Sequence, residues 1–337
     1  MLPNRRGVFV FSLDLELAWG AVHRRGYAGR ERDFEKTRFV VGELLAMFER
    51  HRVQATWAVV GHLLLDACKP EQGRKHPEIV RPEYGTGDFD WFDRDPCSNV
   101  DEDPHWYAPD IIRSILDCRE PQEIGSHNFS HVMVIDGCSK ESLASELKAS
   151  ESAAKRWDLE LRSFVFPRNA VGHLDTVASA GYRAFRGVSS DWTSRMPRLL
   201  RRPARFVDAF WPGAVASSMP VRQSGMWNIP ASYNYLHRSG WGRLVPVSVR
   251  VRKSISGLQD AASRGGVFHL WTHPFNLASD PEPLLAGLDE VFHAYAALRD
   301  SGLIANATMG ELASTLGVAG ADKSSDRPTP VGIGVTK

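Results

Sequence analysis

The sequence has few cysteines, no long apolar run and no excess of charge of either sign. Its four cysteines lie far apart in a chain of 337 residues and form no Cys-x-x-Cys pair: Cys68, Cys97, Cys118 and Cys138. A chain of this length can bury a core without disulfide staples. These features together predict reduced thiols in the cytosol.

The charges of the chain are nearly balanced. Lys and Arg number 41 and Asp and Glu number 40, which gives a net charge of +1. Nothing in this balance calls for a polyanionic partner, so we expect no general nucleic-acid binding. The first apolar run, residues 8–13, is too short and too soon followed by carboxylates to be a signal sequence or a membrane span. The sequence therefore predicts a cytoplasmic protein.

Short apolar runs alternate with longer amphipathic segments along the chain. The runs rich in β-branched and aromatic residues predict strands, and the segments with helical spacing predict helices. The expected strands are residues 8–13, 53–60, 123–125, 163–166, 182–185, 266–271 and 303–307. The expected helices are residues 34–50, 111–118, 140–157, 175–180, 254–263 and 283–299. Seven or eight such units predict a barrel of parallel strands rather than an open sheet.

Two long stretches interrupt this alternation, about residues 69–109 and 190–228. We expect them to be loop insertions that act as lids or binding loops, with disorder as the competing explanation. The second holds an arginine cluster within residues 195–205, which would suit a phosphate or anionic lipid headgroup, or else form a solvated face. We expect one domain, residues 1–316, followed by a flexible tail, residues 317–337.

Two carboxylates follow the first expected strand. Asp14 and Glu16 point to the same side because strand side chains alternate with period two. Such a pair repels itself unless a cation or a shared proton intervenes. Catalytic groups of parallel β/α folds lie at the carboxyl ends of strands. We interpret one carboxylate as a metal ligand and the other as a base; a helix or turn cap is the alternative.

Histidines occupy two further positions of interest. His127 and His131 are four residues apart, so on one helical turn they would share a face and converge on a cation; capping of a turn is the alternative. His273 ends the strand 266–271 just before Pro274, where it could donate a proton near neutral pH. We expect His269, deeper in that strand, to be packed and hydrogen-bonded.

Five motifs in order resemble the polysaccharide deacetylase superfamily, the NodB-homology group or carbohydrate esterase family 4. They are Asp-x-Glu at 14–16, Ser-His-x-x-x-His at 126–131, Phe-Pro-Arg-Asn at 166–169, Asp-Trp at 191–192 and the strand ending in His273. The resemblance spans residues 8–276. It implies a deformed (β/α)7 barrel that binds a divalent ion, most often Zn²⁺, and removes N-acyl or O-acyl groups from sugars.

The resemblance also implies a role for individual residues. The implied metal ligands are Glu16, His127 and His131, and the implied catalytic groups are the base Asp14, the general acid His273 and Arg168, which would keep the base ionised. The implied substrate-binding residues are Trp19, Asn169, Trp192 and Asn276. Leu15 and Glu16 depart from the commoner family pattern of two adjacent aspartates, and Asp-x-Glu is closer to the intracellular branch that deformylates a lipid-linked amino sugar.

These implications predict a hydrolase that removes an acetyl or formyl group from an amino sugar. We expect the sugar to be carried by a nucleotide or a polyprenyl phosphate during O-antigen or capsule assembly, with peripheral contact at the inner membrane. One alternative is a metal-independent cyclic amidase of the same fold. Another is a non-catalytic carbohydrate-binding barrel, although the intact acidic and histidine motifs speak against it.

Overall fold

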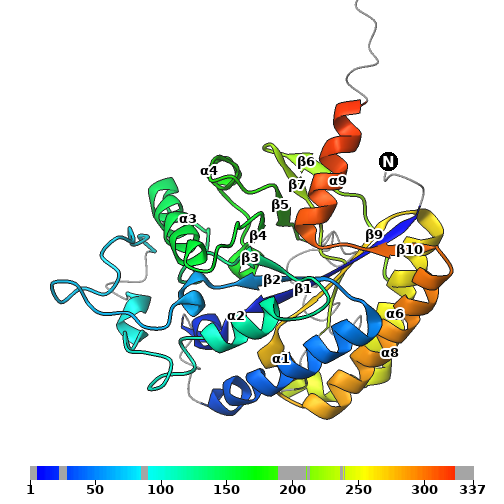
Figure 1. The fold of residues 1–337 in the computed structure, drawn as a ribbon, viewed down its shortest axis with the longest axis horizontal. Helices are drawn as coiled ribbons and strands as arrows, with labels where there is room; N and C mark the ends of the chain where they lie inside the picture. The colour runs from blue at the N-terminus through cyan, green and yellow to red at the C-terminus, as the bar shows by residue number, and fades with distance from the viewer. Residues whose placement is uncertain are drawn as a thin grey trace, which may run out of the picture.

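Parallel strands form the centre of the molecule and helices pack around them (Figure 1). The computed structural model describes residues 6–22, 29–84, 90–188, 210, 213–235, 238 and 240–322. Five strands pair in parallel in the order β1 (Gly7–Leu15), β2 (Ala55–Val59), β3 (Glu123–Ser126), β4 (Ser163–Val165) and β5 (Ala184–Arg186). On its other side β1 pairs in parallel with β9 (Val267–Thr272), and its first residues also pair with β10 (Ile304–Asn306).

One bent segment joins the two edges of this sheet. Its first part, β7 (Met226–Asn228), pairs in parallel with β5, and its second part, β8 (Tyr233–Asn234), pairs in parallel with β9. The backbone N–H of Ile229 binds the carbonyl of Phe185, and that of Tyr235 binds the carbonyl of Trp271. Counting β7 and β8 as one strand, seven strands surround the interior, which confirms the predicted deformed (β/α)7 barrel.

The helices connect the strands and cover the outside of the sheet (Figure 1). The longer ones are α1 (Glu31–His51), α2 (Pro109–Leu116), α3 (Lys140–Lys155), α4 (Leu174–Ser179), α6 (Val247–Arg264), α8 (Pro281–Asp300) and α9 (Met309–Asp322). The short ones are η2 (Leu17–Ala21), η3 (Gly61–Leu64), η4 (Trp91–Arg94), η5 (Pro167–Asn169), η7 (Gly240–Leu244) and α7 (Pro274–Leu277). In α1 the first turn is acidic and the last is basic, an arrangement that complements the helix dipole.

Strand β1 is buried along its whole length, which is why its sequence does not alternate between apolar and polar residues. Phe9 and Phe11 face outward onto the helices; the ring of Phe11 lies 5.4 Å from that of Phe292 in α8. The alternate residues face the barrel interior. Val10, near the start of the strand, belongs to a cluster of buried apolar side chains, whereas Asp14, near its end, is a buried carboxylate. The barrel is thus apolar at one end and polar at the carboxyl end of its strands.

Two predicted boundaries differ from the structure. The described residues within 69–109 are mostly irregular, whereas the stretch 190–228 ends in a hairpin of β6 (Val221–Gln223) and β7. These strands have three residues each, too few for an alternating pattern to be recognised. Helix α9 extends to Asp322, beyond residue 317 where the tail was expected to begin. The arginine cluster at 195–205 lies outside the described residues.

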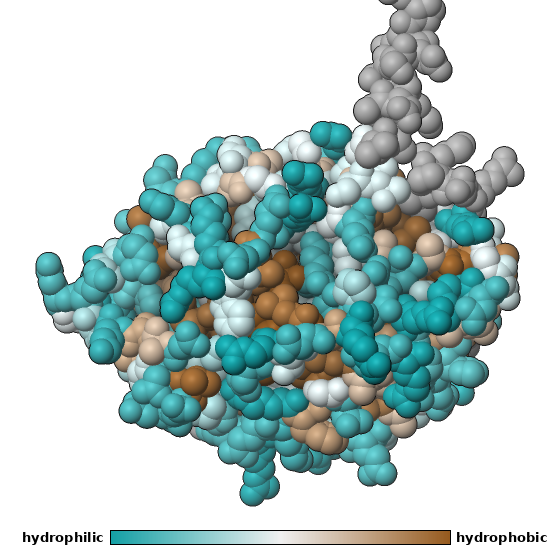
Figure 2. Space-filling model, in the orientation of Figure 1, coloured by the Kyte–Doolittle hydropathy of each residue, from teal (hydrophilic) through white to brown (hydrophobic). Residues whose placement is uncertain are grey.

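The surface shown in Figure 2 is mostly polar, with apolar side chains gathered in a hollow near its centre. None of the helices in the described part of the chain combines the length and apolar character needed to cross a membrane.

Two helix glycines with opposite surroundings test the packing of the barrel. A Cβ at Gly257 in α6 would lie 2.2 Å from the ring of Phe268 in β9, whereas a Cβ at Gly42 in α1 meets nothing within 4 Å. We expect Gly257→Ala to lower the free energy of unfolding by about 1–3 kcal/mol through overpacking. Gly42→Ala should raise it by about 0.5–1 kcal/mol, because alanine favours the helix. Urea denaturation measures both, and equal effects of the two substitutions would contradict the packing described.

Candidate active site

Side chains from four strand ends meet at the polar end of the barrel. Asp14 and Glu16 stand at the end of β1, His127 follows β3, Arg186 ends β5 and His273 follows β9. Parallel strands bring their carboxyl ends to one face, so residues far apart in sequence become neighbours. With His131, which lies four residues after His127, the structure brings together six ionisable side chains, five of which were expected to form a site.

The carboxylate of Glu16 lies at the centre of three imidazoles. Its Oε1 is 3.0 Å from Nε2 of His127, 3.2 Å from Nε2 of His131 and 3.3 Å from Nε2 of His273. His127 donates its Nδ1 proton to the carbonyl of Val165 at 2.8 Å, so its Nε2 carries a lone pair when the ring is neutral. Two acceptors then face one another, and a cation between them satisfies both.

The two histidines of the Ser-His-x-x-x-His motif converge through a loop, not through the helical turn that their spacing suggested. Asn128 and His131 have positive φ angles, 50° and 62°, which a helix does not allow. The side chain of Asn128 binds both the N–H and the carbonyl of Val132. Buried Glu146 of α3 accepts the N–H groups of Phe129 and Ser130. These bonds hold the loop in its tight form.

Burial and charge set the protonation of this group. Burial would raise the pKa of Glu16, but the charges of His273 and His131, together with hydrogen bonds from His127 and His131, hold it well below its ordinary value. Burial lowers the pKa of His131 despite the nearby carboxylate, which favours the neutral form that binds metals. For His273 burial acts in the same direction, but Glu16 and Asp14 outweigh it and the pKa is raised. The pKa values of these two histidines are thus shifted in opposite directions, that of His273 toward the protonated form and that of His131 toward the neutral form.

Asp14 is paired with a buried guanidinium. Arg186 donates to both carboxylate oxygens at 2.6 Å, a two-bond fork, and its guanidinium lies 4.1 Å from the ring centre of Trp271. Burial would raise the pKa of Asp14, but Arg186 and then His273 lower it. The sequence assigned this role to Arg168, which lies exposed on η5; the arginine that binds Asp14 is instead Arg186, buried at the end of β5.

A chain of buried hydrogen bonds fixes Arg186. Its guanidinium also donates to Ser12 Oγ at 3.1 Å, and Ser12 Oγ lies 2.8 Å from Nε2 of His269. The Nδ1 of His269 donates to the carbonyl of Ile229 at 3.2 Å. Burial lowers the pKa of His269 to about 3, so the ring stays neutral. His269 is the packed, hydrogen-bonded histidine that the sequence predicted.

The orientation of His273 follows from its neighbours. Asn276 Nδ2 lies 3.1 Å from Nδ1 of His273, and the Oδ1 of the same amide accepts a hydrogen bond from Arg30 at 3.3 Å. Since Arg30 can only donate, the amide nitrogen faces the imidazole and donates to Nδ1. The proton of a neutral His273 is then on Nε2, the atom that faces Glu16 and Asp14.

The expected substrate-binding residues lie in different surroundings, and not all of them face the site. Trp19 is completely buried and donates its indole N–H to the carbonyl of Trp106, so it presents no face to a sugar. Asn169 is half-buried, and its Oδ1 lies 3.4 Å from Arg186. Asn276 contacts His273 as described above. Trp192 lies outside the described residues.

Two residues of the site carried no motif and were missed. Arg186 directly follows the predicted strand 182–185, and a cation at the end of a barrel strand is a signal that could have found it. Gly20 lies in η2, and a Cβ there would come within 2.0 Å of Glu16 Oε2, so only glycine leaves room for this carboxylate. The space at Gly20 is not visible in the sequence.

Comparison with known proteins gives matches of fold. No protein-family model and no curated protein sequence matches the chain. A structure from Mycobacterium smegmatis described as a polysaccharide deacetylase has a TM-score of 0.62 at 16% identity, over 100% of this chain and 97% of that one. A second so described, from Pseudomonas aeruginosa PAO1, has a TM-score of 0.56 at 10% identity, over 93% and 92%. An allantoinase has a TM-score of 0.57 at 11% identity, over 94% and 92%.

At these identities the likeness concerns the fold. Two of the structures bear the name of the family that the sequence motifs resemble, and their shared architecture confirms the fold that this resemblance implied. The polar strand ends of the barrel are thus those of a deacetylase-like fold, with Glu16, His127 and His131 grouped as a set that could hold a metal ion.

Protonation of Glu146 should link the site loop to pH. Burial raises the pKa of Glu146 to about 7, despite hydrogen bonds from Ser130 and Phe129, against an ordinary value of 4.5. At a pH between these two values, the Glu146 carboxyl is ionised in the unfolded chain but protonated in the folded one. The free energy of unfolding therefore falls as the pH rises through this range. The loss is about 3 kcal/mol across the window. Because glutamine cannot ionise, the Glu146→Gln variant should not show this loss of stability.

Urea unfolding of both proteins at about pH 4 and about pH 8 measures this difference. The free energy of unfolding of Glu146→Gln should improve relative to the wild type as the pH rises. Glu151→Gln, on the exposed face of the same helix, is the matched control and should run parallel to the wild type. Parallel curves for Glu146→Gln would refute the raised pKa.

Proposed function

We propose that this protein is a metal-dependent hydrolase that removes an N-acetyl or N-formyl group from an amino sugar. The observation that carries the proposal is the convergence of three imidazole Nε2 atoms on one buried carboxylate oxygen, 3.0–3.3 Å away, beside an arginine-paired aspartate. Such a constellation provides a metal shell, a base and an acid within reach of one reacting carbonyl.

The metal shell of the proposal consists of Glu16, His127 and His131. Two neutral imidazoles and one carboxylate leave a position open for water or substrate, as in catalytic zinc sites, and Zn²⁺ is the ion we propose. A divalent ion bound there would polarise the acyl carbonyl and acidify water. The hydrogen bond from His127 to Val165 orients the ring for this role, as outer-shell bonds do at metal sites.

The other side chains of the site handle the protons. Asp14 is kept anionic by Arg186 and accepts a proton from the attacking water. His273 presents its Nε2–H toward the reacting group and protonates the departing amine, a poor leaving group unless it is protonated. Its raised pKa keeps this proton available near neutral pH. The Nε2 of the proposed acid His273 lies 3.7 Å from Oδ2 of the proposed base Asp14.

The substrate is proposed as an amino sugar carried by a nucleotide or a polyprenyl phosphate, an intermediate of surface polysaccharide such as O-antigen or capsule. The arginine-rich sequence at 195–205 supports a phosphate-bearing carrier. Such a carrier would place the reaction in the cytoplasm, with contact at the inner membrane. The cyclic amidase alternative is metal-independent, and the intact set of Glu16, His127 and His131 favours the metal-dependent reading.

Metal content and turnover should separate the roles of the ligands and the base. We expect His127→Ala and His131→Ala to lose the active-site metal together with activity. Asp14→Asn should keep the metal and lose about 10²–10⁴-fold in kcat, the usual contribution of a general base. Elemental analysis and amine release from N-acetyl and N-formyl nucleotide sugars measure both.

The control for this experiment is His293→Ala, which removes an exposed histidine of α8. It should change neither metal content nor turnover. Full activity in His127→Ala, or activity of a metal-stripped wild type on a cyclic amide, would refute the metal-dependent mechanism.

Removal of the proposed general acid should depend on the leaving group. We expect His273→Ala to keep its metal and to lose about 10²–10⁴-fold in kcat on an N-acetyl amino sugar. On 4-nitrophenyl acetate, whose phenolate leaves without a proton, the loss should be much smaller. Asp14→Asn should be impaired on both substrates, because water must be deprotonated in each case. Equal losses for His273→Ala on the two substrates would contradict its assignment as the acid.

A further inference from the structure

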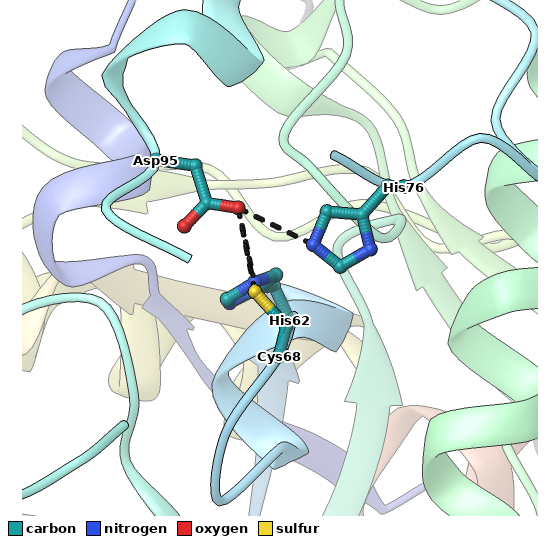
Figure 3. Close-up of side chains that lie close together, drawn as sticks. All are labelled: His62, Cys68, His76 and Asp95. Atoms are coloured by element: carbon teal, nitrogen blue, oxygen red, sulfur yellow. Dashed lines mark hydrogen bonds and ion pairs between the residues drawn. The ribbon is translucent and has the colours of Figure 1, made fainter. Parts of the chain in front are cut away.

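A second group of metal-ligating side chains lies outside the proposed active site (Figure 3). His62 belongs to η3, just after β2, and Cys68 follows it on the chain. His76 comes from the irregular stretch 69–109, and Asp95 directly follows η4 in the same stretch. The four side chains point toward one another, so the long insertion is folded back onto the segment from which it begins.

The ligand atoms of the four residues form a compact cluster. Asp95 Oδ2 lies 3.5 Å from Nε2 of His62, 3.2 Å from Nε2 of His76 and 3.9 Å from Sγ of Cys68. All four ligand atoms lie within 4.8 Å of one another. Around a tetrahedral zinc ion, bond lengths of ~2.0–2.3 Å place nitrogen and oxygen ligands ~3.3 Å apart and sulfur and oxygen ~3.6 Å apart. The observed separations are close to these values.

The outward-facing atoms of the cluster have partners of their own. His62 donates its Nδ1 proton to the carbonyl of Trp106 at 3.1 Å, and His76 donates its Nδ1 proton to Glu78 at 3.2 Å. Asp95 Oδ1 accepts the N–H of Cys97 at 2.9 Å. Carboxylate and carbonyl partners of this kind orient histidine ligands at metal sites.

The inward-facing nitrogens make no hydrogen bond to any of the described residues. His62 is 0% exposed and His76 is 8% exposed, and the Nε2 of each is buried without a hydrogen-bond partner. When a metal ion is bound both rings are neutral, and with Nδ1 protonated each turns its Nε2 lone pair toward the centre of the cluster, where Asp95 Oδ2 also lies. Leaving buried polar atoms without a hydrogen-bond partner destabilises the fold. A cation at the centre satisfies the two nitrogens, the carboxylate and the thiolate at once.

We propose that His62, Cys68, His76 and Asp95 bind a structural zinc ion. Four protein ligands complete a tetrahedral shell and leave no position for substrate, which distinguishes this site from the open shell at Glu16. The mixed set of two imidazoles, one thiolate and one carboxylate suits Zn²⁺ better than Mg²⁺ or Ca²⁺, which prefer oxygen.

The site would fasten the insertion to the loop of the active site. The backbone N–H of His62 binds the carbonyl of Phe129, between the two histidines of the catalytic loop, at 3.0 Å. The ring of Phe129 lies 5.6 Å from that of His62 and 5.1 Å from that of His76. On the other side Trp19, three residues after Glu16, lies 4.6 Å from the ring of His62. Loss of the ion should therefore loosen the active site without removing any of its ligands.

Cobalt provides a probe that reports only on this cluster. A Co²⁺–thiolate bond gives an intense charge-transfer absorption in the near ultraviolet, and the proposed active-site ligands include no cysteine. We expect wild-type protein produced in Co²⁺-supplemented medium to show this absorption. Cys68→Ser should abolish it, whereas Cys97→Ser, the matched neighbour, should retain it. Wild-type protein without the absorption, or its loss in Cys97→Ser but not in Cys68→Ser, would overturn the proposal.

Zinc content separates this proposal from the proposed function. Wild-type protein produced with Zn²⁺ should hold about two ions per chain, one for each set of ligands. The double variant His127→Ala/His131→Ala should lose activity and keep about one, whereas His76→Ala should keep only the ion at Glu16. Fewer than about 0.2 ions in the double variant would mean that a bound water, not zinc, fills the cluster. Failure of the active-site assignment would leave the cobalt absorption unchanged.

Discussion

The buried carboxylate of Glu16 is the charge on which the proposed active site depends. Three imidazoles from two strand ends approach a single oxygen of this group, and the space that the carboxylate occupies exists only because residue 20 has no side chain. An anion buried so deeply is stable only when cations or donors surround it. The histidine loop and His273 supply the surrounding donors, and the proposed metal ion would meet the same requirement.

The second buried carboxylate is stabilised differently. Asp14 lies two residues from Glu16 on the same face of the chain, but it is paired with a guanidinium rather than with imidazoles. That guanidinium is itself fixed by Ser12 and, through it, by His269. The two environments suit the roles proposed for the carboxylates, Glu16 as a metal ligand and Asp14 as a base. Like charges so close together need distinct partners to remain ionised.

Much of the fold could be predicted because its elements are long and periodic. β1, α1 and α8 have strong apolar patterns, and their predicted ranges agree with the structure within a few residues. β6, β7 and β8 escaped prediction because strands of two or three residues have no period, and their pairing with β5 and β9 is non-local. The prediction of a helical turn at His127 and His131 was wrong. Backbone N–H groups in this loop donate to Glu146 of another element, and Asn128 and His131 adopt left-handed backbone angles.

The sequence by itself determined the alternation of β/α units and the polar residues at the strand ends. Spacing and residue type sufficed for these, since both depend on local periodicity and on where a strand stops. Only the tertiary structure decided that Arg186, rather than Arg168, pairs with Asp14, and that His62, Cys68, His76 and Asp95 form one cluster. Contacts between irregular segments far apart in the chain have no periodic pattern in the sequence. They depend on how the loops close and how their side chains pack in the folded protein.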